Sequence, residues 1–561
     1  MDVHLCCRRV GIILNGRTFM SAHFKTPFFK ASAFVAFATL APLTAHAQAT
    51  ALILPPEAGA LMTALTAGSD TSLYAYYEST DFEPVFAGRP AKLAALMAAL
   101  ESAGAHGLPA NDVMIDDLRA AMANAGTPDS NAALELMAAQ AYVDFATDLT
   151  SGLLNPDDIS SLININAVRP ETDDLLAKAA SSNGSGALYD SLEPQDPSYN
   201  ALQEELAHLE ALVEAGGWGP KITAGRALRP GQSNDRVLAM RVRLLALGYV
   251  GTEGDSPRYD EALVEAVKAF QADNTLTADG IVGPQTLTAL NSDPSVQMQQ
   301  VIVNLERRRW LNYELGARHI LVNQANFTGY VMDYGLPTLV TRVVVGKASA
   351  KYQTPEFIDS MTHMVVNPNW NVPQSIASQE YLPQLLRDPS VLTRQNITMR
   401  VRGSGERVDA RLIDMSQYTV NNFPFVLQQQ PGSRNALGKV KFMFPNKYNI
   451  YLHDTPSRSL FNRDSRAYSH GCVRVQRPLD LAYTLLAPQV SDPEGTFQAA
   501  RNTGRATTIN LETPVPIYLT YQTVFLDEAG ELAYRVDVYG RDQLVFDALA
   551  ENGVTLPEIA S

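Results

Sequence analysis

Apolar residues recur at helical spacing through the first part of the chain. From about residue 57 to 216 the sequence is rich in alanine and leucine, and runs such as 91–100 and 132–137 place apolar side chains three or four positions apart. Stripes of this kind pack helices against one another. A stretch rich in glycine and proline at residues 216–231 then interrupts the pattern. We therefore predict a helical scaffold domain over residues 48–220.

Residues 231–291 carry three short amphipathic patterns. Asn234 or Asp235 is suited to cap a first helix that ends at Gly248, because a side-chain oxygen at the start and a glycine at the end satisfy free backbone groups. Apolar residues at helical spacing predict the second and third helices: Leu263, Val267 and Phe270, then Leu287 and Leu290. We predict a separate three-helix domain here.

Beyond about residue 300 the pattern changes to short β-rich runs separated by glycine, proline and asparagine. We predict a mainly β domain over residues 300–488, and a hairpin followed by a helix over residues 505–561. A polar and helix-like insertion at about residues 374–430 is long enough to act as a lid over a site. The predicted fold class is multidomain α+β, with a helical scaffold, a three-helix domain and a mainly β domain that carries a lid insertion.

Residues 1–47 have the features of an export signal. Basic residues precede the apolar run 31–40, and Ala45-His46-Ala47 supplies the small-x-small pattern that signal peptidase cleaves. The apolar run is short for a membrane-spanning helix, so a retained anchor is the weaker alternative. We predict cleavage after Ala47 and export of the remaining chain.

Composition and charge narrow the function classes. A length of 561 residues with 46% hydrophobic and 18% charged residues is typical of a folded protein with about three or four domains. The net charge of −15 argues against a nucleic-acid partner, which is bound through phosphate neutralisation. The segment 434–477, however, contains nine basic and two acidic residues, which predicts a local positive field.

Cys472 is the cysteine that remains after removal of the signal, since Cys6 and Cys7 leave with it. A lone thiol in an oxidising compartment is either buried and inert or used chemically. His453 and His470 lie near it in the sequence, and an imidazole can accept the thiol proton and stabilise the resulting charge. Gly471 lets the backbone approach a substrate closely, and amides around Gly471 and Cys472 could donate to an oxyanion. The pattern favours acyl transfer.

The stretch from His453 to Arg474 resembles the signature of the L,D-transpeptidase family, in which Ser-His-Gly-Cys-Val-Arg follows the histidine after 15 residues. The segments L-x-x-L-G-Y, A-V-x-x-F-Q and D-G-I-V-G-P-x-T within residues 231–291 resemble the three-helix peptidoglycan-binding domain. With its scaffold and its insertion, the chain is similar to the large Gram-negative murein L,D-transpeptidases. This resemblance implies a periplasmic location.

The resemblance also implies residue roles. Cys472 corresponds to the nucleophile and His453 to the base, while the other members of the motif, Ser469, His470 and Gly471, shape the site. A further set corresponds to substrate-binding positions: Arg474, which stands where some members carry asparagine, Tyr451 and Trp370.

The implied reaction is transfer of an acyl group between peptidoglycan stems. Cys472 attacks the carbonyl between residues three and four of a tetrapeptide stem, D-alanine leaves as a thioester forms, and an amine of a neighbouring stem then completes a 3-3 crosslink. The implied partners are the stem peptides and the glycan, with carbapenem-type β-lactams as covalent inhibitors. No cofactor and no metal are needed, because the old peptide bond supplies the energy.

Several alternatives remain open from the sequence. Water in place of the amine would give an L,D-carboxypeptidase or a crosslink hydrolase, and the chain could also be a noncatalytic wall-binding protein. His453, His470 and Cys472 could instead bind zinc. For the enzyme, we expect loss of His453 to raise the pKa of Cys472 toward its free value of about 8.5. The sequence leaves the oligomeric state open.

Overall fold

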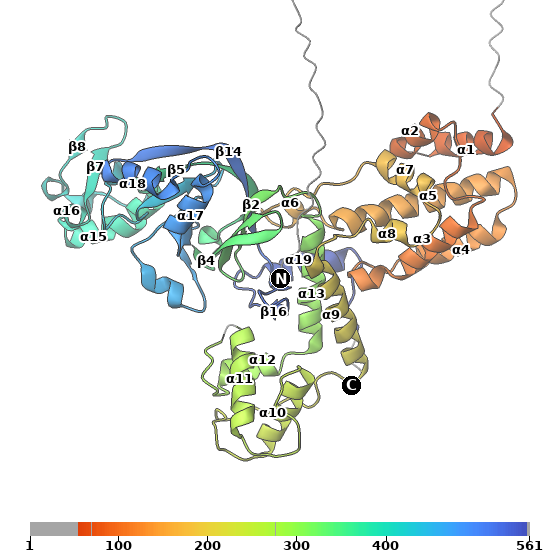
Figure 1. The fold of residues 1–561 in the computed structure, drawn as a ribbon, viewed down its shortest axis with the longest axis horizontal. Coiled ribbons are helices and arrows are strands. Elements are labelled where there is room, and N and C mark those ends of the chain that lie inside the picture. Colours follow the sequence, from red (N-terminus) through yellow and green to blue (C-terminus); the bar gives the residue numbers. More distant parts are fainter. Residues whose placement is uncertain (1–53, 69, 275, 558–561) are drawn as a thin grey trace, which may run out of the picture. The chain divides into compact units, whose positions relative to one another are not determined.

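The computed structural model describes residues 54–68, 70–274 and 276–557, so the predicted signal peptide lies outside the described residues. Helices form the first part of the described chain, and strands dominate after residue 317 (Figure 1), which confirms the multidomain α+β class. No helix within the described ranges has the length and apolar character that a membrane crossing requires.

The alanine- and leucine-rich region folds around one long helix, α5 (Pro128–Ser151), which contacts α1, α3, α4 and α7. Its start is fixed by a capping box between Thr127 and Ser130. The Glu135 carboxylate is fully buried in the helix core and accepts hydrogen bonds from the backbone N–H groups of residues 85–87. The surrounding helices are α1 (Pro56–Ala67), α2 (Thr71–Ser79), α3 (Pro90–Glu101), α4 (Asp112–Asn124), α7 (Thr172–Ser181) and α8 (Ala187–Asp190). The short helix α6 (Pro156–Ile159) packs against a different core.

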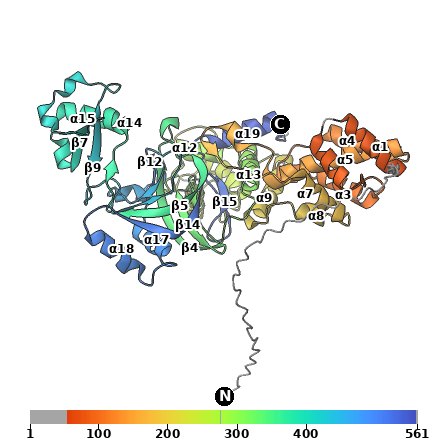
Figure 2. The ribbon, with the colours of Figure 1, turned by 90° about the horizontal axis from the view of Figure 1, so that it is seen from above.

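A second helical layer is built on α13 (Pro294–Arg309), which contacts both α9 (Pro197–Glu214) and α19 (Arg541–Glu551), as Figures 1 and 2 show. These helices share an apolar core with a hairpin of β15 (Val524–Leu526) and β16 (Leu532–Tyr534). Residues from distant parts of the chain therefore pack together in one apolar core.

The three-helix region consists of α10 (Asp235–Ala246), α11 (Glu261–Asp273) and α12 (Pro284–Leu290) around its own apolar core. The Asn234 side chain accepts the Arg236 N–H at 3.0 Å and so caps α10. The buried guanidinium of Arg243 donates to three backbone carbonyls, those of Gly219, Leu290 and Ser292. These hydrogen bonds hold the unit together.

One large mixed sheet forms the β-rich region. Its order is β1-β5-β10-β11-β13-β4-β3-β2-β14, with β12 beside β4, and β14 also pairs with β5, so the series of strands closes on itself. Helices α17 (Pro478–Leu486) and α18 (Pro493–Asn502) pack on each other and contact β4 and β5 respectively. The strands are β1 (Ile163–Asn164), β2 (Arg318–Asn323), β3 (Thr328–Asp333), β4 (Leu336–Gly346), β5 (Glu356–Val366), β10 (Val440–Met443), β11 (Leu452–His453), β12 (Ala467–Ser469), β13 (Val473–Val475) and β14 (Thr507–Thr520).

Two sequence-based boundaries are wrong for this sheet. β14 lies beyond residue 488, where we ended the mainly β domain, yet it is a full member of the sheet. The run 516–521, which we placed in the terminal hairpin, is largely the end of β14. Pro514 and Pro516 obscured this strand, because proline usually ends a strand pattern. The structure accommodates them with a register shift between Asn510 and Val515.

The insertion is a folded unit with its own apolar core (Figure 2). Its four-stranded sheet has the order β6-β9-β7-β8. The π-helical turn Ala377–Tyr381 connects α14 to α15; such turns are frequent at functional sites. The remaining elements are β6 (Trp370–Asn371), β7 (Ile397–Val401), β8 (Arg407–Val408), β9 (Phe425–Gln429), α14 (Gln374–Ile376), α15 (Leu382–Arg387) and α16 (Val391–Arg394).

Candidate functional site

The candidate site lies on one face of the large sheet, where β10, β11 and β13 are neighbours. Lys441 is opposite His453 in the register, and His453 is opposite Arg474. Leu452 and Val473, between these positions, are buried in the core. Because alternate residues of a strand share a face, Tyr451 and Cys472 join the polar row. We call this group the site face: Lys441, Tyr451, His453, Cys472 and Arg474.

The Cys472 thiol is half-buried and donates to the Asn449 carbonyl oxygen at 3.7 Å. Burial raises the pKa of Cys472 to about 11, although hydrogen bonds from Tyr451 and the positive charges of Arg474 and Lys441 act in the opposite direction. The Lys441 ammonium also lies 5.4 Å from the centre of the Tyr451 ring. At neutral pH Cys472 is therefore a protonated thiol near the positive charges of Arg474 and Lys441.

His453 is buried and held in one orientation. Its Nδ1 lies 2.5 Å from the carbonyl oxygen of Asp454. A carbonyl only accepts, so Nδ1 carries the proton and Nε2 has the free lone pair. Burial, together with the charges of Arg474 and Lys441, lowers the pKa of His453 to about 3, although the Asp454 hydrogen bond acts in the opposite direction. The imidazole is therefore neutral and able to accept a proton.

The structure corrects the expected relation between these two groups. The pKa of Cys472 lies above the free value of about 8.5 with the imidazole already in place, so His453 does not hold a low-pKa thiolate in the resting protein. Burial acts on both groups and disfavours both charged forms. The pair is a thiol and a neutral imidazole, and proton transfer must accompany attack on a substrate.

A pH profile tests this state. Iodoacetamide reacts with the thiolate, whose fraction at pH 7 is about one in ten thousand for a pKa near 11. We expect the alkylation rate of Cys472, followed by peptide mapping, to rise about tenfold per pH unit from pH 6 to 10, because the thiolate fraction rises as pH approaches the pKa. A plateau below pH 9 would indicate a thiolate–imidazolium pair instead.

Ser469, His470 and Gly471 form the turn before the thiol. The buried Ser469 hydroxyl accepts the Gly471 N–H at 3.0 Å, so this amide is engaged within the turn and the Cys472 N–H is the donor left for an oxyanion. Gly471 has φ +116°, and a Cβ there would lie 3.1 Å from the Ile450 side chain. Glycine is therefore required at this position.

His470 lies apart from the site face. Its Nε2 is 2.5 Å from the Glu380 carboxylate in the insertion and 3.2 Å from Lys347 Nζ, and its ring meets Tyr352 edge-on at 4.8 Å. Within the described part of the chain, no cluster of three or more histidine, cysteine or acidic side chains is arranged to hold a metal ion, so the zinc alternative finds no ligand set there. His470 connects the turn to the insertion.

Trp370 and most of the basic residues also lie elsewhere. Trp370 is a half-buried member of the insertion core, with its ring 6.4 Å from that of Tyr381. Of the nine basic residues of 434–477, Lys441 and Arg474 belong to the site face. Arg458 pairs with Asp454, and Arg477 pairs with Asp480. Ion pairs with Asp454 and Asp480 therefore offset part of the positive charge counted in the sequence.

Comparison with known proteins shows which domains the regions of the chain resemble. Residues 317–517 match the model of the L,D-transpeptidase catalytic domain, which contains the whole site face. Residues 71–206 match a scaffold domain, and residues 233–290 match a "putative peptidoglycan binding domain". The site face therefore lies in a region similar to the L,D-transpeptidase catalytic domain.

Among relatives of the chain is a protein of Haemophilus influenzae (strain ATCC 51907 / DSM 11121 / KW20 / Rd) named "Putative L,D-transpeptidase", 35% identical over 227 residues. The match covers 39% of this chain and 44% of that protein, so it spans less than half of either. A crystal structure of the L,D-transpeptidase from Xylanimonas cellulosilytica DSM 15894 is 14% identical, with coverage of 54% of this chain and 100% of the other and a TM-score of 0.16. That TM-score is too low for the superposition to be used further.

Proposed function

We propose that the chain is an L,D-transpeptidase that uses Cys472 as its nucleophile and His453 as its base on peptidoglycan stem peptides. The observation that carries the proposal is that a neutral imidazole, whose Nδ1 alone is engaged by the Asp454 carbonyl, and a protonated thiol lie on the same face of the sheet. The positive charges of Lys441 and Arg474 favour the thiolate as it forms. They also favour return of the proton from His453 to the leaving group.

The proposed reaction has two balanced steps. In the first, the Cys472 proton moves to His453, sulfur bonds to the carbonyl carbon between residues three and four of a tetrapeptide stem, and the C–N bond breaks. D-alanine leaves with the proton from the imidazolium. In the second, a side-chain amine of a neighbouring stem attacks the thioester and the thiol is restored. The product is a 3-3 crosslink.

The function is tested with the full chain and purified disaccharide tetrapeptides. Mass spectrometry of the products is expected to show a 3-3 linked dimer together with free D-alanine. Loss of D-alanine without dimer would indicate the carboxypeptidase, and the absence of both products would contradict acyl transfer on these stems.

We further propose that the three-helix region retains the protein on peptidoglycan and that the chain acts in the periplasm after removal of residues 1–47. Its match to a peptidoglycan-binding model and its independent apolar core support the first point. The export pattern of the first 47 residues supports the second. Carbapenem-type β-lactams, which carry a strained amide carbonyl, are the expected covalent inhibitors.

The contacts of the π-helical turn support a role for the insertion as a lid. Besides the Glu380–His470 pair, the Gln379 side-chain oxygen accepts from Lys351 Nζ at 2.8 Å and from the Tyr352 hydroxyl at 3.3 Å. These contacts hold the insertion beside the turn that carries Cys472. A lid in this place would keep water from the thioester.

Replacement of Glu380 by alanine is expected to raise the ratio of hydrolysed to crosslinked product. Glu380 is 43% exposed, and pairs of this kind contribute up to about 1 kcal/mol, so the expected change is at most about fivefold. The measurement is product analysis by mass spectrometry, with Glu406→Ala, an exposed change in the same insertion, as control. An unchanged ratio would argue against the lid.

A further inference from the structure

Thr354 lies two residues before the start of β5 and is fully buried. Its hydroxyl donates to the Gly471 carbonyl oxygen at 2.7 Å and accepts the Gly346 N–H at 2.9 Å. Both hydrogen-bonding functions of the hydroxyl are therefore used, and one of them is directed at the peptide that joins Gly471 to Cys472.

That peptide carries the Cys472 N–H, the donor left for an oxyanion. In a planar trans peptide the C=O and the following N–H point in opposite directions, so an interaction that fixes the carbonyl oxygen also fixes the N–H. The backbone at Gly471 does not fix this plane alone, because glycine adopts more conformations than other residues. A contact from outside the turn is needed.

We propose that Thr354 is a positioning residue, which holds the Gly471–Cys472 peptide so that the Cys472 N–H faces the developing oxyanion. The inference rests on the proposed role of Cys472 as nucleophile and adds to it the part of the fold that prepares its amide. Thr354 acts through this peptide and not on the substrate.

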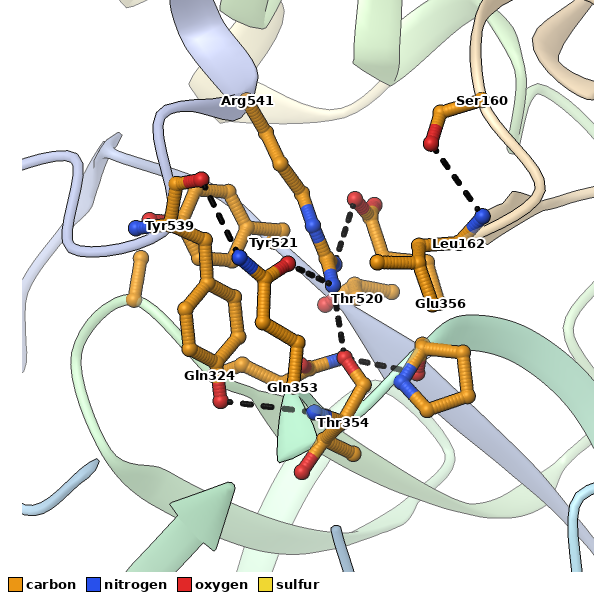
Figure 3. A network of polar contacts seen from close by, with 12 residues as sticks. Ser160, Leu162, Gln324, Gln353, Thr354, Glu356, Thr520, Tyr521, Tyr539 and Arg541 are labelled. Carbon is orange, nitrogen blue, oxygen red and sulfur yellow. Dashed lines mark hydrogen bonds and ion pairs between the residues drawn. The ribbon is translucent and has the colours of Figure 1, made fainter. Parts of the chain in front are cut away.

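Thr354 is itself held by the C-terminal region, as Figure 3 shows. Arg541 Nη2 donates to the Thr354 carbonyl at 2.7 Å and to the Gln353 side chain at 3.2 Å, while Nη1 pairs with Glu356 at 3.0 Å. The side chains of this pair are 1% and 2% exposed. Loss of either partner would leave a buried charge, so the arrangement is rigid.

Tyr539 supports the same segment from a second direction. Its hydroxyl donates to the Gly346 carbonyl at 2.7 Å and lies 3.5 Å from the Thr354 N–H, and its ring lies against the Arg541 guanidinium at 4.7 Å. Gly346 is in turn opposite Ser469 in the register of β4 and β12. Contacts from the C-terminal segment thus extend through Thr354 and Gly346 to both ends of the turn before Cys472.

The test compares two reactions of Cys472 in the full chain. Acylation by a carbapenem passes through an oxyanion, whereas alkylation by iodoacetamide does not. For Thr354→Val, which keeps the shape and removes the hydroxyl, we expect acylation to fall roughly 10- to 100-fold and alkylation to stay unchanged, since loss of one oxyanion donor typically lowers rates by about 10²- to 10³-fold. Thr354→Ser should restore acylation.

Thr252→Val is the matched control. Thr252 is also fully buried, and its hydroxyl donates to the Tyr249 carbonyl in the three-helix region, away from the site face. Both rates should equal those of the unmodified protein. If Thr354→Val fails to fold, Tyr539→Phe tests the same point, because it removes the supporting hydroxyl and keeps the ring; its selective loss of acylation should be smaller.

Each remaining outcome contradicts the inference. Equal loss of acylation and alkylation in Thr354→Val would mean that the residue only maintains the fold. Unchanged acylation in both Thr354→Val and Tyr539→Phe would mean that the peptide needs no such support. An unmodified protein that is alkylated at Cys472 but never acylated would contradict the proposed function, and the inference with it.

Discussion

The Cys472→Ala variant is expected to lose all covalent reaction with carbapenems and all formation of 3-3 crosslinks. The reaction requires a sulfur that bonds to the substrate carbonyl, and Cys472 is the free cysteine among the described residues. Its side chain is half-buried, so the smaller alanine should leave the sheet intact. Intact-mass spectrometry after incubation with a carbapenem measures the expected adduct on the unmodified chain and its absence on the variant.

Two controls make this result specific. Circular dichroism and thermal unfolding should match for the variant and the unmodified chain, which excludes loss of the fold as the cause. Peptide mapping should place the adduct on Cys472 and not on Cys6 or Cys7, in preparations that retain the first 47 residues. An adduct of the same mass on Cys472→Ala would show that the nucleophile lies elsewhere.

The sequence predicted the parts of the fold that have local signals. The helices of the first region, the three short helices of residues 231–291 and the β-rich region all depend on spacing that can be read within a few turns or strands. β14 was missed because its partners β2 and β5 are distant in the sequence and its prolines obscured it. The register of β14 is set by its pairing with these two distant strands.

The candidate site was predictable only in part. The motif predicted that His453 and Cys472 act together, and in the structure they lie at neighbouring strands of one sheet. The contributions of Thr354, Glu380 and Arg541 had no sequence signal, because each reaches the turn before Cys472 from a distant part of the chain. The pKa values of His453 and Cys472 could not be predicted from the sequence either, because they depend on burial in the folded protein.

His453→Ala is expected to lower carbapenem acylation of Cys472 at neutral pH by roughly 10²- to 10⁴-fold, the usual contribution of a general base. Because Cys472 is a protonated thiol in the resting protein, attack needs an acceptor for its proton, and His453 has a free Nε2 on the same face. His453→Asn should behave in the same way: its amide nitrogen occupies the position of Nδ1 and can still donate to the Asp454 carbonyl, but it is not a base.

His470→Ala is the matched comparison, because His470 is closer to Cys472 in the sequence but directs its ring to Glu380 and Lys347. We expect its acylation rate to fall less than about tenfold, since the general base stays in place and a partly exposed hydrogen bond of this kind contributes only about 1 kcal/mol. Rates of acylation measured against pH for the three variants decide the assignment. If His470→Ala shows the larger loss and His453→Ala retains most of its rate, the two roles must be exchanged, and the turn before Cys472 would then supply the base.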